Sequence, residues 1–141
     1  MKVFVTGVGG QLGYDVINEL KRRGYEAIGS DITESADIQL DITDKIAVER
    51  VLTAINPDAV IHCAAWTAVD AAEDKENKEK VYAVNVTGTR NIAEVCKQLN
   101  CKMVYISTDY VFNGQGTEPR QADCKDFALL NYYRQKKLKV N

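Results

Sequence analysis

The sequence has few of the residues on which metal sites and disulfide frameworks depend. Among its 141 residues there is a single histidine, His62, and the four cysteines include no CxxC pair. No apolar run approaches the ~20 residues needed to cross a bilayer, and no signal-peptide pattern follows Met1. We therefore expect reduced thiols, no metal centre, no membrane partner and a cytoplasmic location.

An excess of positive charge is also lacking. The formal net charge of −2, from 18 Lys and Arg and 20 Asp and Glu, gives no basic balance of the kind that favours nucleic acid. Residues 120–141 are locally basic, which is typical of a solvated terminus and also compatible with a polyanion contact. An apolar content of 45% is ordinary for a globular protein, and the length fits one domain.

Short apolar runs alternate with helical patterns along the chain. The patterns predict strands over 3–5, 26–30, 59–63 and 102–107, and helices over 11–23, 44–55 and from 71 to 80 or on to about 99. The run from Ala59 to Cys63 is apolar nearly throughout, as strands buried on both faces are. This alternation predicts an α/β fold with a doubly wound parallel (Rossmann) sheet, whose ligand crevice lies at the carboxyl ends of the strands.

A glycine-rich turn joins the first predicted strand to the first predicted helix. Gly7, Gly10 and Gly13 form the pattern GxxGxxG. In such a turn the first glycine allows a tight bend, the second allows close approach of a pyrophosphate, and the third allows the helix to pack on the strand. The helix N-terminus presents amide donors to the phosphates. The pattern predicts a dinucleotide site, and a purely structural turn is the alternative.

Two acidic residues follow at positions where a dinucleotide is recognised. Asp31 ends the second predicted strand, 18 residues after Gly13. A carboxylate there accepts hydrogen bonds from the adenosine ribose and repels a 2′-phosphate, which favours NADH over NADPH; a surface-turn aspartate is the alternative. We expect Asp41 and Ile42 to place a carboxylate and an apolar side chain against adenine.

Five stretches then form a set that is recognisable as a whole. They are Gly7-x-x-Gly10-Gln11-Leu12-Gly13, Asp41-Ile42-Thr43, His62-Cys63-Ala64-Ala65-Trp66-Thr67-Ala68-Val69-Asp70, Asn85 and Ser107-Thr108-Asp109-Tyr110-Val111-Phe112. The set resembles the extended short-chain dehydrogenase/reductases, and among them most of all the dTDP-4-dehydrorhamnose reductases. The resemblance is strong over residues 1 to about 119. It implies reduction of the C4 ketone of dTDP-4-dehydro-6-deoxy-L-mannose to dTDP-L-rhamnose with NADH or NADPH.

The resemblance also implies a catalytic tyrosine and lysine. Tyr133 would supply a proton to the ketone oxygen, and Lys137 would bind the nicotinamide ribose and lower the pKa of that tyrosine. Tyr132 and Lys136 have the same spacing, so spacing alone leaves the register open. Asn131 favours the pair Tyr133 and Lys137, because the family carries asparagine two residues before its tyrosine.

Further roles are implied residue by residue. Thr108 would hold the ketone oxygen, and Asn85 would support a proton-relay water beside the lysine. The residues expected at the cofactor are Gly7, Gly10, Gln11, Leu12, Gly13, Asp31, Asp41, Ile42, Ala64, Ala65, Thr67 and Lys137. Those expected at the nucleotide-sugar substrate are Val69, Asp109 and Tyr110. Trp66 is expected either at the cleft or in packing.

The last part of the sequence departs from the family pattern. Arg134 and Lys136 stand where relatives carry small residues, Lys139 replaces an acidic residue, and Leu129 replaces proline. Relatives continue into a substrate-binding lobe, so we expect residues 1–141 to be the NAD(P)-binding Rossmann domain, with the last ~20 residues atypical and the lobe absent. A non-catalytic dinucleotide-binding or regulatory module is the alternative function, and another sugar-nucleotide enzyme such as an epimerase is a third. The sequence leaves a homodimer and a role for Mg²⁺ undecided.

Overall fold

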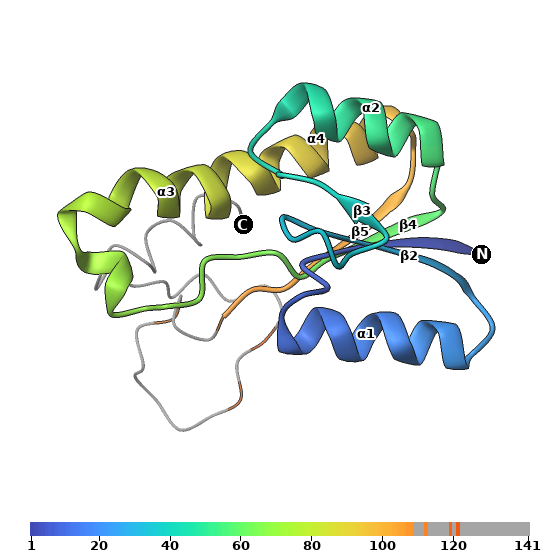
Figure 1. Cartoon of the computed structure of the whole chain (residues 1–141), viewed down its shortest axis with the longest axis horizontal. Coiled ribbons are helices and arrows are strands. Elements are labelled where there is room, and N and C mark those ends of the chain that lie inside the picture. Colours follow the sequence, from blue (N-terminus) through green and yellow to red (C-terminus); the bar gives the residue numbers. More distant parts are fainter. Residues whose placement is uncertain (109–111, 113–118, 120, 122–141) are drawn as a thin grey trace.

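Five parallel strands form one sheet in the part of the chain that is described. The structure, a computed structural model, describes residues 1–108, 112, 119 and 121 (Figure 1). The strands are β1 (Lys2–Thr6), β2 (Glu26–Asp31), β3 (Ile38–Gln39), β4 (Ala59–His62) and β5 (Lys102–Tyr105). Their order in the sheet is β3-β2-β1-β4-β5, and every pairing is parallel. The prediction of a doubly wound parallel sheet is confirmed.

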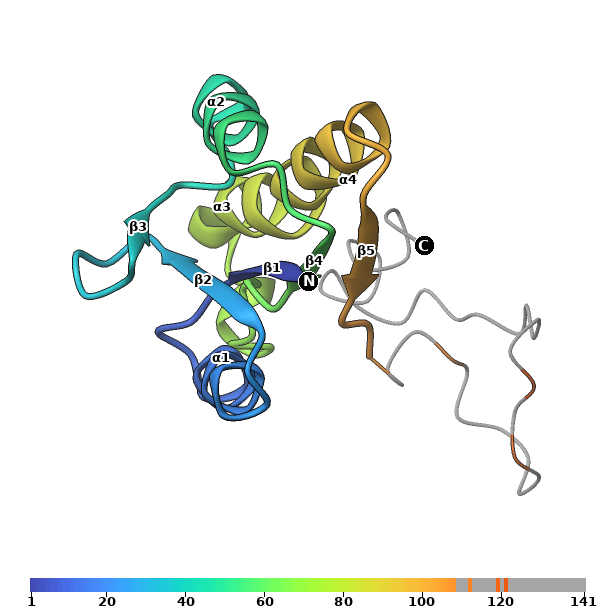
Figure 2. The ribbon, with the colours of Figure 1, turned by 90° about the vertical axis from the view of Figure 1, so that its right-hand side faces the viewer.

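Helices cover both faces of this sheet. In Figure 2, α1 (Gln11–Arg22) lies on one side, and α2 (Lys45–Ile55) and α4 (Thr89–Gln98) lie on the other. The chain moves from β1 to β2 in one direction and from β4 to β5 in the opposite direction. Because crossovers between parallel strands are right-handed, the two directions place their helices on opposite faces. The strand order therefore reverses between β1 and β4, which makes this the switch point of the fold.

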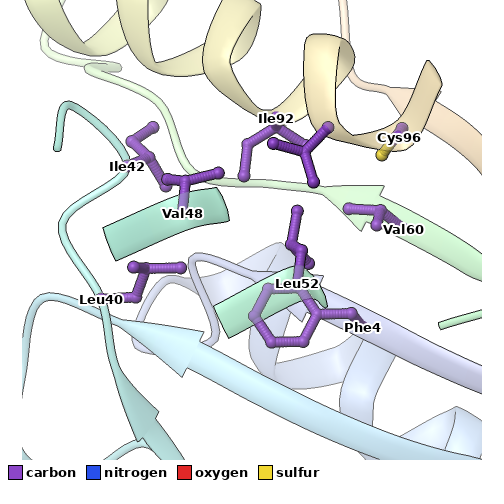
Figure 3. Close-up of a cluster of buried hydrophobic side chains, with 9 residues drawn as sticks. Phe4, Leu40, Ile42, Val48, Leu52, Val60, Ile92 and Cys96 are labelled. Carbon is purple, nitrogen blue, oxygen red and sulfur yellow. The ribbon is translucent and has the colours of Figure 1, made fainter. Parts of the chain in front are cut away.

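The main core lies between the sheet and α2 and α4. Phe4 from β1, Val60 from β4, Leu52 from α2 and Ile92 from α4 are each fully buried, and they converge in Figure 3. Burial of such side chains stabilises a fold by about 1.5–3 kcal/mol each. The helix α2 begins at a good cap, because the Asp44 carboxylate accepts hydrogen bonds from the backbone N–H groups of Ile46 and Ala47, both at 3.0 Å.

The opposite face of the sheet is covered only in part. Val3 and Val5 from β1 pack against Ile17 of α1. The side chains of β5 alternate between the two faces, and Val104 is 51% exposed and Ile106 38% exposed. The α1 side of the sheet is therefore well packed over β1 and β2 and apolar but accessible along β5.

One predicted helix begins later than the sequence pattern indicates. Instead of a helix from Ala71, the chain forms two 3-10 turns, η1 (Ala71–Glu73) and η2 (Lys75–Asn77), and α3 (Lys78–Tyr82) follows. Asp74 between the turns is extended, with ψ of 134°. The Asn77 side-chain amide donates to the Ala71 carbonyl oxygen at 2.9 Å and holds this bend. The charged stretch also lacks an apolar stripe that would bury a regular helix before Val81.

The predicted continuation toward residue 99 is confirmed. A helical run continues from α3 through a π-helical segment, η3 (Ala83–Gly88), into α4. The short strand β3 was not predicted as a strand, because only two of its residues pair with β2 and two residues carry no periodicity.

Candidate functional site

The glycine-rich turn is built around two close backbone approaches. Gly7 has a φ of +73°, and a Cβ there would lie 2.6 Å from the backbone nitrogen of Ala64. A Cβ on Gly13 would lie 2.1 Å from the carbonyl oxygen of Gly7. The tight bend and the close packing of helix on strand, which the pattern predicted, are therefore present. A Cβ on Gly10 would meet only the Gly7 oxygen, at 3.5 Å, so the fold itself does not exclude a side chain there.

A cleft of about 780 Å³ opens at the carboxyl ends of the strands, next to this turn. It brings together every residue predicted at the cofactor within residues 1–108, namely Gly7, Gly10, Gln11, Leu12, Gly13, Asp31, Asp41, Ile42, Ala64, Ala65 and Thr67. Thr108 lines the same cleft from the segment that follows β5. The volume lies within the range of sites that take cofactors and other small molecules.

Asp31 is held in place at the edge of the cleft. Its Oδ2 accepts a hydrogen bond from the Gly9 backbone N–H at 3.0 Å, and its Oδ1 accepts one from the Thr33 N–H at 3.2 Å. Each carboxylate oxygen has a second lone pair. The side chain is therefore fixed by the glycine turn on one side and the following turn on the other, and it retains capacity to accept hydrogen bonds from a ligand.

Asp41 and Ile42 form another wall of the cleft. The Asp41 Oδ1 accepts from the Thr43 N–H and from the Thr43 hydroxyl, both at 2.8 Å, which shapes the turn before α2. Ile42 is 5% exposed and packs so closely on the end of η3 that a Cβ on Gly88 would lie 2.6 Å from its Cδ1. The Ile42 carbonyl oxygen accepts from the buried Asn91 amide at 2.9 Å. This wall is therefore rigid and backed by the main core.

The loop after β4 is anchored at two points. The Ala64 N–H donates to the Thr6 hydroxyl oxygen at 3.2 Å. Further along, the Trp66 N–H donates to Asn85 Oδ1 at 2.8 Å, and the Asn85 amide donates back to the Trp66 carbonyl oxygen at 3.1 Å. Asn85 is completely buried and lies in the π-helical segment η3, a type of irregularity that is frequent at functional sites. The prediction that Asn85 supports a water beside Lys137 stays a prediction.

Behind this loop lies a buried histidine, whose surroundings the sequence did not reveal. His62 is 1% exposed, its Nδ1 is 2.7 Å from the Thr6 hydroxyl oxygen, and its Nε2 is 3.0 Å from the Thr89 hydroxyl oxygen. Its ring is stacked on that of Tyr105, with centroids 6.0 Å apart. In the sequence only its place in an apolar strand suggested burial. No pattern linked it to a threonine 56 residues before it and another 27 residues after it.

The remaining predicted site residues are distributed as follows. Val69 does not line the cleft but packs with Trp66 against the buried Ala72 and Val81. Trp66 both packs in this cluster and lines the cleft. Four residues predicted at the substrate or in catalysis lie outside the described residues: Asp109, Tyr110, Tyr133 and Lys137. The alternative pair, Tyr132 and Lys136, also lies outside them.

The electrostatics of the described cleft do not create a nucleophile from its cysteine. Cys63 lines the cleft, and partial burial raises the pKa of its thiol, which favours the protonated form. Among the described residues, no group of three or more His, Cys, Asp or Glu side chains could hold a metal ion. In the same part of the chain, no helix is both long and apolar enough to span a bilayer.

The sheet is open and parallel, and its strand order reverses between β1 and β4. A cleft lies at that point, beside a glycine turn. These features define a doubly wound α/β protein of the Rossmann class. The chain belongs to the RmlD substrate binding domain family, which it matches over residues 1–140.

Proteins of similar sequence and structure support this family membership. The chain is 40% identical over 127 residues to a dTDP-4-dehydrorhamnose reductase of Mycobacterium tuberculosis. The matched region covers 89% of this chain and 39% of that protein. The crystal structure of a dTDP-4-dehydrorhamnose reductase from Clostridium acetobutylicum superimposes with a TM-score of 0.87 at 36% identity, over 99% of this chain and 47% of the other. The enzyme of the same name from Bacillus anthracis, solved in complex with NADP, gives a TM-score of 0.86 at 37% identity, over 99% and 48%. The chain thus spans less than half the length of these relatives.

Proposed function

We propose that this chain is the NAD(P)-binding domain of a reductase that converts dTDP-4-dehydro-6-deoxy-L-mannose to dTDP-L-rhamnose. The observation that carries the proposal is that one cleft joins the glycine turn, Asp31, the Asp41–Ile42 wall and the Ala64–Ala65 loop. Relatives named for this reaction, one of them solved with NADP, support it. The residues present fit a dinucleotide, because Gly10 leaves room for a close approach and Asp31 retains acceptor capacity at the cleft edge.

The predicted site residues would divide the work as follows. The bound dinucleotide supplies the hydride. The N-terminus of α1 and the turn at Gly10 would bind the pyrophosphate through backbone N–H groups. Thr108 would donate a hydrogen bond to the ketone oxygen of the sugar, and Tyr133 would give that oxygen its proton. Lys137 would hold the nicotinamide ribose and favour proton release from the tyrosine.

We infer a preference for NADH over NADPH from Asp31. A 2′-phosphate at the adenosine ribose would bring negative charge against a carboxylate that two backbone N–H groups hold in place. The Bacillus anthracis relative was solved with NADP, so the preference of this chain needs its own measurement. Trp66 is the only tryptophan and lines the cleft, so quenching of its fluorescence reports binding of either nucleotide.

The test is a pair of titrations with NADH and NADPH on the wild-type chain and on Asp31→Asn. We expect the wild type to bind NADH more tightly and the variant to lose that preference, chiefly by binding NADPH better. Glu49→Gln, which neutralises an exposed carboxylate on α2, is the matched control and should leave both affinities unchanged. Tighter binding of NADPH by the wild type would overturn the inferred preference. Absence of binding of either nucleotide would overturn the assignment of the cleft.

A second candidate is a dinucleotide-binding module without catalysis. It is favoured by Arg134 and Lys136, two large cations one and three residues after the predicted catalytic tyrosine in the sequence, where the family resemblance implies small residues. Single-turnover reduction of the sugar ketone, measured with the wild type and Tyr133→Phe, separates the two candidates. Reduction by the wild type that Tyr133→Phe abolishes supports the reductase. Binding of NADH without any reduction supports the module.

A further inference from the structure

A continuous chain of hydrogen bonds runs from the loop after β4 to the π-helical segment, and two of its members, Thr6 and His62, line the cleft. It begins at the Ala64 N–H, which donates to the Thr6 hydroxyl oxygen. That hydroxyl is 2.7 Å from His62 Nδ1, and His62 Nε2 is 3.0 Å from the Thr89 hydroxyl oxygen. The Thr89 hydroxyl in turn donates to the Asn85 carbonyl oxygen at 3.1 Å. Thr6, His62 and Thr89 are each exposed by no more than 1%.

The two ends of this chain determine its direction. A hydroxyl has one proton to donate, and Thr89 uses it on the Asn85 carbonyl oxygen, which can only accept. The Thr89 oxygen must therefore accept from His62, which places a proton on Nε2. At the other end the Thr6 oxygen accepts from Ala64, so its own proton is available to His62 Nδ1. A neutral imidazole that donates from Nε2 and accepts at Nδ1 satisfies every link.

The same chain connects two parts of the site that would otherwise be independent. Asn85 receives the hydrogen bond of Thr89 on its carbonyl, while its side chain holds both backbone groups of Trp66. Ala64 and Trp66 lie in the stretch of loop that lines the cleft. We propose that Thr6, His62 and Thr89 are positioning residues, which act through the Nε2-protonated imidazole of His62 to hold this loop against Asn85. An effect of these residues on nucleotide binding rests on the proposed function, whereas their hydrogen-bond geometry does not.

The single histidine makes the first test direct. A chain labelled with ¹⁵N in the imidazole ring gives signals from His62 alone, and these distinguish the two neutral tautomers and the cation. We expect a protonated Nε2 and an unprotonated Nδ1 in the wild type at neutral pH, without any ligand. A proton on Nδ1, or on both nitrogens, would overturn the proposal whether or not the chain binds a dinucleotide.

The second test asks whether loss of a hydrogen bond at Thr89 loosens the loop after β4. Thr89→Val touches neither Ala64 nor Trp66, yet we expect it to speed hydrogen exchange of both backbone amides by about tenfold, the typical effect of losing one buried hydrogen bond. Thr89→Ser, which keeps the hydroxyl, should restore slow exchange. Exchange at the β1 amides corrects for global stability, and Thr53→Val, an exposed threonine of α2, is the matched control. Unchanged exchange at Ala64 and Trp66 in Thr89→Val would overturn the proposal.

NADH affinity provides a third readout that separates this inference from the proposed function. Thr6→Val should weaken NADH binding by about tenfold, and Thr6→Ser should recover it. Equal affinities for Thr6→Val and the wild type, with NADH bound by both, would contradict positioning and leave the dinucleotide site standing. If the wild type binds no NADH, the proposed function fails, and the tautomer and exchange measurements still decide the role of the three residues.

Discussion

Replacing Gly13 by alanine tests the closest backbone approach in the site. The new Cβ would lie 2.1 Å from the Gly7 carbonyl oxygen, 2.6 Å from the Gly7 carbonyl carbon and 2.9 Å from Val8 Cα. All three are backbone atoms, so α1 or the turn has to move by roughly 1 Å to restore ordinary contacts. Overpacking of this kind costs about 3 kcal/mol, and the higher helix propensity of alanine returns about 1 kcal/mol. We therefore expect the free energy of unfolding to fall by about 2 kcal/mol.

The assay is urea denaturation followed by circular dichroism. With an m-value of about 2 kcal/mol/M, the loss corresponds to a decrease of about 1 M in the urea midpoint. Gly10→Ala is the matched control, because its Cβ would meet only the Gly7 oxygen at 3.5 Å. We expect Gly10→Ala to change stability by less than about 1 kcal/mol, and to weaken NADH binding because the methyl group enters the cleft. A Gly13→Ala chain as stable as the wild type would refute the packing argument, and undiminished NADH binding by Gly10→Ala would refute the argument from close approach.

Three further predictions concern the fold around the site. Leu52→Ala should lower the free energy of unfolding by about 2–5 kcal/mol because it leaves a cavity in the main core. Ile46→Ala on the same helix should change this free energy little because Ile46 is 78% exposed. Urea midpoints of the two variants test the difference. Asp44→Ala should cost about 1 kcal/mol through loss of the cap on α2, and Asp44→Asn should recover most of it in the same assay. Burial and the neighbouring Cys101 raise the pKa of Cys96 to about 12, so its alkylation near pH 9 should be slow in the native chain and fast after unfolding, as peptide mass spectrometry will show. Because this pKa is raised from 9.0, the unfolded chain releases the proton first, and the contribution of Cys96 to stability is lost as the pH rises from about 9 toward 12. Equal alkylation rates in the native and unfolded chain would refute this last prediction.

Local patterns in the sequence were sufficient for four of the five strands and for most of the cleft. The turn at Gly7 and Gly13 was predictable, because the positive φ of Gly7 and the close contact of Gly13 with Gly7 arise within a few residues. Asp31 ends β2, a strand that the sequence pattern predicted, whereas Asp41 follows the short strand β3, which it did not. Once parallel strands were predicted, their carboxyl ends had to meet at one edge, which brought these residues together.

Features that depend on distant contacts were not predictable in the same way. The hydrogen bonds of His62 join three secondary-structure elements, and no spacing in the sequence connects them. The start of α3 depends on the amide of Asn77 reaching back to Ala71, which overrides the helix propensity of the charged residues between them. The packing of Val69 against Ala72 and Val81 was not visible in its motif, and its place at the substrate stays a prediction.

The central pairing of β1 with β4 also has a consequence for the kinetics of folding. Val3 to Thr6 pair with Ala59 to His62, so the two walls of the cleft come from segments separated by more than fifty residues and meet only when this pair closes. Contacts of such sequence separation form late, because the entropy of closing the intervening loop opposes them. A dinucleotide in the refolding buffer would therefore find no site until the central strands have joined. We expect it to leave the folding rate nearly unchanged and to prolong the lifetime of the native state.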